Sequence, residues 1–167
     1  SPPCRCSVYI SGSLTAEPGQ WAPGPGAELF SSVRNELRGL PFIAEDLGLI
    51  TEDVTALRDQ LGIPGTRVLQ FAFDGNRANP HLPENYSENT VAYTATHDNP
   101  TSREWYEQLS KFERECFARS VGRSESEARD APQELIRLAW SSHAALAITP
   151  LQDLLNLGTD GRMNVPG

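Results

Sequence analysis

The amino-acid sequence predicts an α/β fold in which parallel strands alternate with covering helices. Short apolar runs at 40–44, 67–73, 90–96 and 146–149 have the length of strands. Segments with helical spacing of apolar residues separate these runs, as expected for parallel strands joined by crossover helices. Two of the runs end abruptly in acidic residues, and functional side chains of such folds lie at the carboxyl ends of strands.

Composition restricts the classes of partner. The chain has 167 residues, 38% of them hydrophobic and 22% charged, which is enough for one globular domain with a core. Its net charge of −8 disfavours nucleic acid and anionic membranes, which repel an acidic surface. No apolar run approaches the roughly 20 residues of a membrane span, and the N-terminus is a poor secretory signal. Three cysteines make no disulfide framework, so we expect a cytoplasmic location, with a plastid stroma equally compatible.

The N-terminal part is expected to be organised around one helix. Residues 1–25 are rich in Pro, Gly and Ser and are expected to be mostly irregular, so we separate 1–20 from a structured part at 21–167. The segment 27–38 predicts a helix whose Leu29, Val33 and Leu37 form a buried stripe. Gly39 is expected to stop that helix.

The middle of the chain repeats the strand-and-helix pattern. The run 40–44 leads into Glu45 and Asp46, and a helix is predicted at 51–61 with Thr51 as its cap. The next run, 67–73, is apolar at almost every position, as in a strand buried on both faces. A loop at 74–89 follows, and its length and polar and aromatic residues favour a functional role.

The last part of the chain is predicted to be mainly helical. The strand 90–96 ends in a Thr-His-Asp-Asn segment. Helices are expected at 102–121, with Trp105, Leu109, Phe112 and Cys116 on one face, at 131–144, with Leu135, Ile136, Ala139 and Trp140, and at 151–155. About four strands result, whereas a (β/α)8 barrel needs eight strands and about 250 residues. The chain is therefore a small open sheet or part of a barrel.

The two acidic strand ends allow two interpretations each. Glu45 beside an apolar wall such as Phe42 would have a raised pKa and could act as a general acid, or Glu45 or Asp46 could cap a turn or pair with an arginine. Asp98 could stabilise a developing positive charge while His97 binds a substrate hydroxyl. Alternatively, both could serve the fold, with Asp98 or Asn99 capping the next helix.

Two carboxyl groups on either side of one bond are the arrangement of glycoside cleavage. One protonates the leaving oxygen, and the other attacks the anomeric carbon or stabilises an oxocarbenium-like centre. Trp21, Tyr86 and Trp105 are candidates for stacking on sugar rings, although a helical aromatic such as Trp105 is more typical of a core. The sequence contains neither a phosphate-binding glycine loop nor a Gly-x-Ser-x-Gly nucleophile elbow.

Ordered motifs resemble the amylomaltase family of 4-α-glucanotransferases, also called disproportionating enzyme. The most specific are Ala-Glu-Asp-Leu-Gly at 44–48, Thr-His-Asp-Asn at 96–99 and Arg-Met-Asn at 162–164. Further segments that match in the same order are 62–65, 68–73, 79–86, 139–142 and 150–153. The resemblance runs from about residue 15 to residue 167 and implies a partial (β/α)8 TIM barrel, with about four strands of its C-terminal half.

The resemblance also implies roles. Glu45 would be the acid/base of a retaining double displacement that moves α-1,4-glucan segments between maltodextrin chains, and Asp98 would stabilise the transition state. His97 would contact the sugar, and Asn164 is a further candidate for a sugar contact. Such a reaction needs no cofactor and no metal, because carboxylates carry out the proton transfer and the covalent step.

Departures from the family predict an incomplete site. The family's nucleophile is an Asp in an Arg-x-Asp-His segment, which no part of these 167 residues matches, and Pro100 replaces an acid that usually follows His-Asp-Asn. We therefore expect these residues to need the missing N-terminal half of the barrel as a partner and to be inactive alone. The alternatives are a non-catalytic glucan-binding remnant, a self-contained α/β domain with another role, and a hydrolase that uses water as acceptor.

Overall fold

The structure, a computed structural model, describes residues 5–8, 20–48 and 50–164. The chain forms two compact units, residues 1–65 and residues 66–167. Both strands and helices are present in each unit, so the predicted α/β class is confirmed. None of the helices in the described ranges is long and apolar enough to cross a bilayer.

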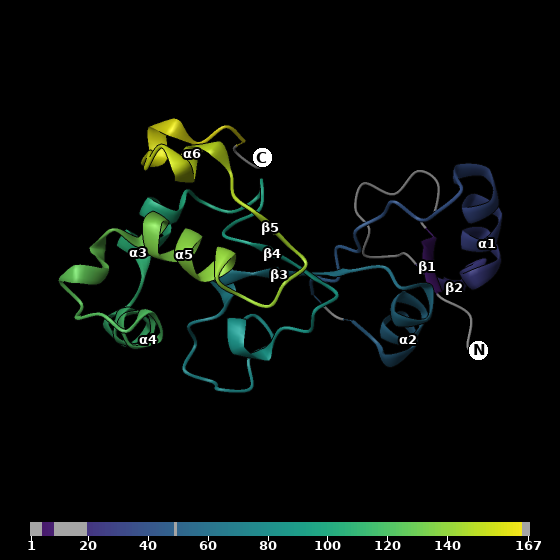
Figure 1. The fold of residues 1–167 in the computed structure, drawn as a ribbon, viewed down its shortest axis with the longest axis horizontal. Helices are drawn as coiled ribbons and strands as arrows, with labels where there is room; N and C mark the ends of the chain where they lie inside the picture. Colours follow the sequence, from purple (N-terminus) through teal and green to yellow (C-terminus); the bar gives the residue numbers. More distant parts are fainter. Residues whose placement is uncertain (1–4, 9–19, 49, 165–167) are drawn as a thin grey trace. The chain divides into compact units, whose positions relative to one another are not determined.

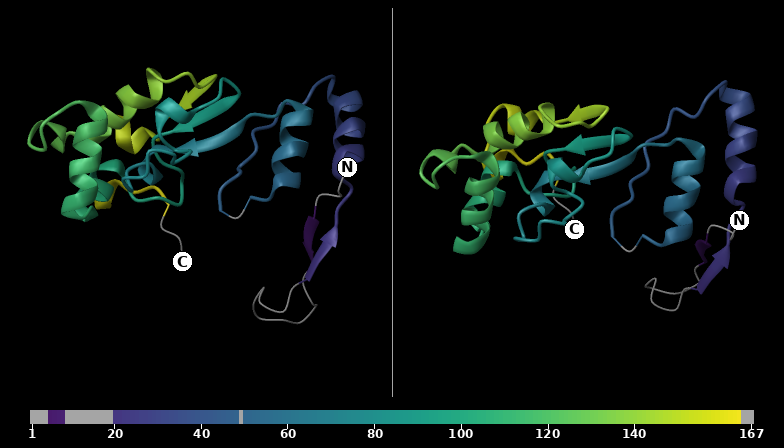
Figure 2. Two further views of the ribbon diagram at one scale, coloured as in Figure 1. Left: turned by 90° about the horizontal axis from the view of Figure 1, so that it is seen from below. Right: turned by 60° about the horizontal axis from the view of Figure 1, so that its bottom comes forward.

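The described part of the first unit contains two strands and two helices. β1 (Arg5–Val8) pairs with β2 (Gln20–Pro23) in antiparallel fashion, which differs from the irregular structure expected for 1–20. Residues 9–19 of that segment lie outside the described ranges. α1 (Gly26–Leu37) and α2 (Glu52–Leu61) lie side by side, and the Arg34 guanidinium donates a hydrogen bond to the Leu61 carbonyl at 3.1 Å (Figure 2).

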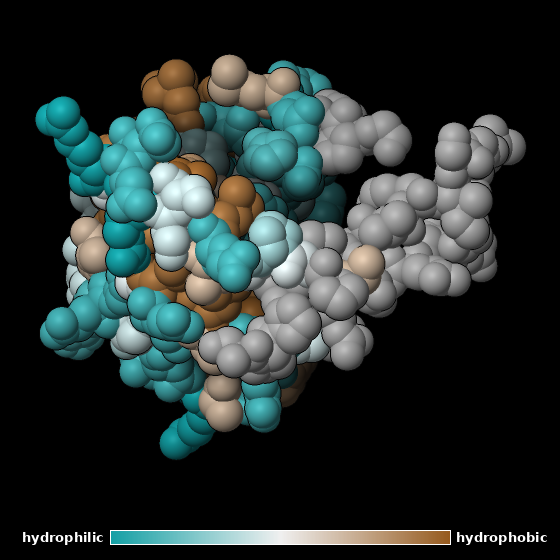
Figure 3. All heavy atoms as spheres, turned by 90° about the vertical axis from the view of Figure 1, so that its right-hand side faces the viewer, coloured by the Kyte–Doolittle hydropathy of each residue, from teal (hydrophilic) through white to brown (hydrophobic). Residues whose placement is uncertain are grey.

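The buried stripe predicted for α1 is wrong for this structure. No residue of α1 is buried, and Leu29 and Leu37 are 49% and 55% exposed, because in the described part of this unit α1 packs mainly on α2. The view in Figure 3 shows hydrophobic side chains exposed among hydrophilic ones. The helix also ends one residue earlier than expected, since Arg38, not Gly39, takes the left-handed conformation, with φ of 55°.

The strand expected at 40–44 is reduced to a single bridge. Ala44 pairs in parallel with Gly65, and its N–H donates to the Pro64 carbonyl at 2.9 Å. Phe42 and Ile43 remain 39% and 43% exposed. A strand needs a partner along its length, and within this unit the run has one only at its last residue.

The second unit is built on a three-stranded sheet with the order β3-β4-β5 (Figure 1). The strands are β3 (Gly65–Val68), β4 (Thr90–Tyr93) and β5 (Leu146–Ile148). β4 and β5 are parallel, with Val91 opposite Leu146 and Tyr93 opposite Ile148. The chain between them passes through helices, as the alternating pattern predicts, but through three helices rather than the two expected.

The expected strand 67–73 ends early. After Val68 the chain turns into a 3-10 helix at Leu69–Phe71. Two hydrogen bonds explain the turn, because the Trp105 indole N–H donates to the Gln70 carbonyl at 3.1 Å and the Gln70 amide donates to the Pro100 carbonyl at 3.1 Å. If the strand continued, the Gln70 carbonyl and amide would not be positioned for these two hydrogen bonds.

The helix predicted at 102–121 is two helices, so that prediction is wrong in this respect. α3 (Ser102–Gln108) ends before Leu109, and α4 (Lys111–Val121) begins with a capping box in which Ser110 and Glu113 each bond the other's backbone N–H. Phe112 is consequently 58% exposed instead of sharing the buried face of Trp105. The remaining helices are α5 (Ala131–Trp140) and α6 (Leu151–Leu154), with short 3-10 turns at Pro83–Asn85, Glu127–Arg129 and Thr159–Gly161.

Replacing Ser110 with Ala should lower the free energy of unfolding by about 1 kcal/mol, the usual contribution of an N-cap hydroxyl. The reason is that the Ser110 hydroxyl accepts from the Glu113 N–H at 3.3 Å at the start of α4. Urea denaturation of the 167-residue chain measures the change. Ser31→Ala is the control, because that exposed hydroxyl only donates to the Ala27 carbonyl of its own helix. Equal losses for both variants would contradict the assignment.

The core of the second unit is aromatic. Phe117 is fully buried, and its ring lies 4.9 Å from that of Phe73, 5.5 Å from that of Trp105 and 5.7 Å from that of Tyr106, centroid to centroid. Cys116 is buried beside it, as predicted from its place on a helix face. Edge-to-face packing of this kind fixes α3 and α4 against the chain that follows β3.

Polar side chains of the loop 74–89 donate hydrogen bonds to backbone carbonyls of the loop and of the segment before it. The Asn79 amide donates to the Phe71 carbonyl at 2.8 Å, and the Asn85 amide donates to the Asn79 carbonyl at 2.8 Å. The Tyr86 hydroxyl donates to the His81 carbonyl at 2.9 Å, and burial raises the pKa of Tyr86 above its usual range. These groups hold the loop in one conformation.

Candidate functional site

Glu45 lies in the first unit, directly after the bridge at Ala44. Its side chain is exposed and makes no hydrogen bond or ion pair with any residue that the structure describes. The Phe42 ring, expected to form an apolar wall, packs edge-on against Phe30, with centroids 6.3 Å apart, and is 39% exposed. Glu45 is therefore positioned by its backbone, and its side chain is exposed.

Asp46 has the structural role that the sequence left open. Its side chain is only 4% exposed and forms an ion pair with Arg58 of α2. Burial alone would lower the pKa of Arg58, but the neighbouring Asp59 and Asp46 raise it. A Cβ at Gly65 would stand 2.7 Å from the Arg58 guanidinium and 2.8 Å from the Asp46 carboxylate, so a larger residue there would displace the ends of these two side chains. The ion pair fixes the backbone next to Glu45.

His97 and Asp98 lie on a tight turn just after β4, in the second unit. Asn99 closes this turn, because its side-chain oxygen accepts from the Thr96 N–H at 2.9 Å and from the Thr96 hydroxyl at 2.6 Å. The expected capping of α3 by Asp98 or Asn99 is wrong, since Thr101 accepts from the Glu104 N–H at 3.2 Å and caps that helix. The turn leaves His97 and Asp98 pointing outward, with side chains 70% and 63% exposed.

Asn164 and Arg162 join this turn from the far end of the sequence. The Asn164 amide donates to the His97 carbonyl at 2.9 Å and to the Asp98 carboxylate at 3.3 Å. The Arg162 guanidinium donates to the Asp98 carbonyl at 2.7 Å. His97 Nε2 itself lies 3.4 Å from the Asp98 carboxylate. The structure thus brings together three of the four residues singled out from the sequence, while the fourth, Glu45, belongs to the other unit.

The buried carboxylate of Asp153 stabilises the segment that contains this turn. Asp153 of α6 is fully buried and accepts three hydrogen bonds: from the Thr94 hydroxyl at 2.9 Å, the Ser102 N–H at 2.8 Å and the Ser102 hydroxyl at 2.7 Å. Thr94 and Ser102 flank the segment that carries His97 and Asp98. Asp153 therefore fixes both ends of this segment.

Sequence reasoning gave no role to Asp153 or Arg162. Both lie in segments that carried the resemblance, at 150–153 and 162–164, and that was the only signal for either residue. Two of the aromatic residues considered for stacking on sugar rings are buried. Trp105 lies in the core, as expected for a helical aromatic, and Tyr86 of the loop 74–89 is buried as well. The side chain of Trp21 lies outside the described part.

The described geometry is that of an α/β protein with exposed carboxylates at strand ends, and solved structures share its fold. An amylomaltase from Streptococcus agalactiae in complex with acarbose matches with a TM-score of 0.86 and 35% sequence identity, over 96% of this chain and 32% of that one. An amylomaltase from Corynebacterium glutamicum matches with a TM-score of 0.66 and 19% identity, which supports the fold alone.

Residues 8–167 match the 4-alpha-glucanotransferase family, and the chain belongs to that family. A 4-alpha-glucanotransferase of Synechocystis is 51% identical over 158 residues, which are 93% of this chain and 31% of the relative. A chloroplastic/amyloplastic 4-alpha-glucanotransferase of Solanum tuberosum is 46% identical over 148 residues, 89% of this chain and 25% of the relative. The chain spans about a third or less of the length of these relatives. The resemblance stated from motifs is confirmed.

Proposed function

We propose that this chain is part of the catalytic barrel of a 4-α-glucanotransferase and transfers α-1,4-glucan segments together with the rest of that barrel. The observation that carries the proposal is the family match over residues 8–167. The joint placement of His97, Asp98 and Asn164 on one exposed face of the second unit supports it. A cytoplasmic or stromal location is compatible with these relatives, since one is bacterial and the potato protein is named as chloroplastic/amyloplastic.

In the proposed reaction Glu45 first acts as an acid and then as a base. It gives its proton to the glycosidic oxygen as the bond to the anomeric carbon breaks, while a carboxylate from the rest of the barrel forms a covalent bond to that carbon. Glu45 then takes a proton from the acceptor hydroxyl, which attacks and releases the enzyme carboxylate. Protons and electrons balance without a cofactor. The Glu45 side chain is exposed in the described part of the chain, so it is accessible to a substrate.

Asp98 would stabilise the positive charge that develops on the sugar ring. Its carboxylate is positioned by the Asn164 amide at 3.3 Å, and its backbone is held by Arg162 at 2.7 Å. A fixed negative charge is effective because it needs no reorganisation as the ring becomes charged. His97 and the side-chain oxygen of Asn164 would bind sugar hydroxyls, while the Asn164 amide N–H groups donate to His97 and Asp98.

The 167 residues alone should show no disproportionation of maltotriose. A retaining mechanism needs a nucleophile, and no Arg-x-Asp-His segment is present to supply one. The assay separates products by chromatography after incubation of the purified, mass-verified chain with maltotriose. A chimaera in which residues 8–167 replace the matching part of the Synechocystis relative should be active. Transfer by the 167 residues alone, or no transfer by a folded chimaera that binds maltodextrin, would contradict the proposal, and the second result would indicate a glucan-binding remnant.

A further inference from the structure

The short helix α6 buries its polar residues and exposes its apolar ones. Gln152 and Asp153 are 6% and 0% exposed, whereas Leu151 and Leu154 are 59% and 43% exposed. Burial of a leucine stabilises a fold more than burial of an amide does, so buried polar side chains are the informative ones. Asp153 holds the segment that carries the proposed stabiliser. The burial of its neighbour Gln152 indicates a second function of this helix.

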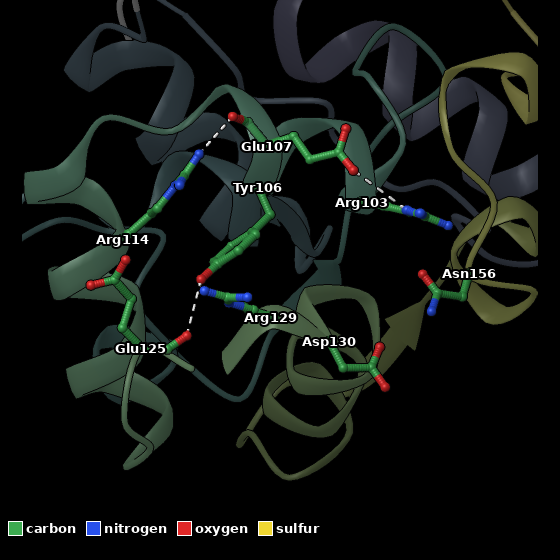
Figure 4. Close-up of a pocket in the computed structure, with 8 residues that line it drawn as sticks. All are labelled: Arg103, Tyr106, Glu107, Arg114, Glu125, Arg129, Asp130 and Asn156. Atoms are coloured by element: carbon green, nitrogen blue, oxygen red, sulfur yellow. Dashed lines mark hydrogen bonds and ion pairs between the residues drawn. The ribbon is translucent and has the colours of Figure 1, made fainter. Parts of the chain in front are cut away.

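The backbone at the end of α6 fixes the place of Gln152. The Leu157 N–H donates to the Gln152 carbonyl at 2.9 Å, and the Asn156 N–H donates to the Asp153 carbonyl at 3.0 Å. Asn156 has φ of 51°, the left-handed conformation that ends many helices with this pair of bonds. Its side chain lines a hollow together with Arg103 (Figure 4), and its backbone alone serves the helix end. Both polar side chains of α6 therefore start from a fixed backbone.

The Gln152 side chain holds the segment 162–164. Its Oε1 accepts from the Met163 N–H at 3.2 Å. The Met163 side chain is 80% exposed, so packing of this residue contributes little to holding the segment. Among the described residues, this bond is the one hydrogen bond that joins the segment to α6. The position of the segment therefore depends on the Gln152 amide.

The residues on either side of Met163 contact Asp98. The Arg162 guanidinium donates to the Asp98 carbonyl at 2.7 Å, and the Asn164 amide donates to the Asp98 carboxylate at 3.3 Å. The Arg162 Nε is buried without an acceptor in the part of the chain that the structure describes. A buried donor without an acceptor lowers stability, which favours a role of this side chain in placing Asp98.

Adjacent residues of α6 thus hold Asp98 by two routes. Asp153 accepts from Thr94 and from Ser102, which flank the segment that contains Asp98. Gln152 holds the segment whose side chains donate to Asp98 from the other direction along the sequence. One helix therefore sets the position of the carboxylate relative to its donors.

We propose that Gln152 is a positioning residue for glucan transfer, which acts through Arg162 and Asn164 without touching the substrate. The inference rests on the proposed function. A carboxylate that stabilises a developing charge must be fixed in advance, and a misplacement of about 1 Å can lower a rate by about 10²-fold. Without the Gln152 acceptor, the segment 162–164 loses its bond to α6, and Asp98 loses its fixed donors.

The test replaces Gln152 with Met, which has a similar size and no amide. In NMR spectra of the 167-residue chain, the signals of the Asn164 side-chain amide and of the Asp98 backbone N–H should shift. In the chimaera described above, kcat/KM for transfer from maltotriose should fall by about fivefold or more. Gln133→Met, the same change at an exposed position of α5, is the matched control and should behave like the parent.

A double-mutant cycle separates positioning from a general loss of stability. In a chimaera that carries Arg162→Ala and Asn164→Ala, the further change Gln152→Met should lower transfer by less than about twofold, because the groups through which Gln152 acts are gone. An equal fold loss in both backgrounds, parent-level transfer by the Gln152→Met chimaera, or unchanged Asp98 and Asn164 signals would overturn the proposal. A folded but inactive parent chimaera would overturn the proposed function itself, and this inference with it.

Discussion

Replacing Glu45 with Gln in the active chimaera should lower glucan transfer from maltotriose by about 10²- to 10⁴-fold, the usual contribution of a general acid–base group. Gln keeps the size of the side chain but can neither give nor take the proton. The fold should be unaffected, because the Glu45 carboxylate is exposed and makes no hydrogen bond or ion pair with any described residue. Asp46, whose ion pair with Arg58 fixes the backbone here, remains intact in this variant.

The leaving group distinguishes lost proton transfer from lost binding. A maltosyl fluoride donor needs no protonation of its leaving group, so its first step should be restored in the Glu45→Gln chimaera, whereas maltotriose cleavage should not. Glu52→Gln, another exposed acid of the first unit, is the control and should keep full activity. If Glu45→Gln cleaved maltotriose at the parent rate, Glu45 would not be the acid/base.

Replacing Asp153 with Ala should lower the free energy of unfolding by about 3 kcal/mol or more. The substitution removes the acceptor of three hydrogen bonds at a fully buried position and leaves the Ser102 N–H and two hydroxyls unpaired. Buried donors without an acceptor lose their hydration and gain nothing in return. Asp153→Asn should be less costly, because one side-chain oxygen remains to accept.

Urea denaturation followed by tryptophan fluorescence measures this effect, since Trp105 lies in the core of the same unit. Asp160→Ala is the matched control, because that carboxylate is exposed a few residues further along and should change stability by less than about 0.5 kcal/mol. Backbone signals of 95–99 in the Asp153→Asn variant should also shift, since both ends of that segment are attached to this carboxylate. A loss below about 1 kcal/mol for Asp153→Ala would show that the network is not important for stability.

The existence of most elements was predictable, but their ends were not. Apolar periodicity locates β4, β5 and α5 to within a few residues because their buried faces follow the pattern. The break between α3 and α4 depends on one serine and one glutamate, which a continuous apolar stripe masks. The end of β3 depends on contacts of Gln70 with Pro100 and Trp105, some thirty residues away, which no local pattern contains.

The site was predictable in its residues and less so in its arrangement. Acids at strand ends singled out Glu45 and Asp98, and the ordered motifs added His97 and Asn164. The structure adds how the last three are held, through Arg162, Asn99 and the buried Asp153. Contacts between residues more than fifty positions apart require the fold itself. Trp140 was assigned to the apolar face of its helix but is 64% exposed. It is the last residue of α5, and burial of that face ends at Ala139.

One contact between the loop at 74–89 and the end of β3 depends on the protonation of His81. The Val68 N–H at the end of β3 donates to Nδ1 of His81 at 3.0 Å, so the neutral ring must carry its proton on Nε2. A second proton would occupy the accepting nitrogen, and the strand end would lose its bond to the loop. Protonation of His81 would therefore remove this bond, and the Asn79 amide would still attach the loop to the Phe71 carbonyl.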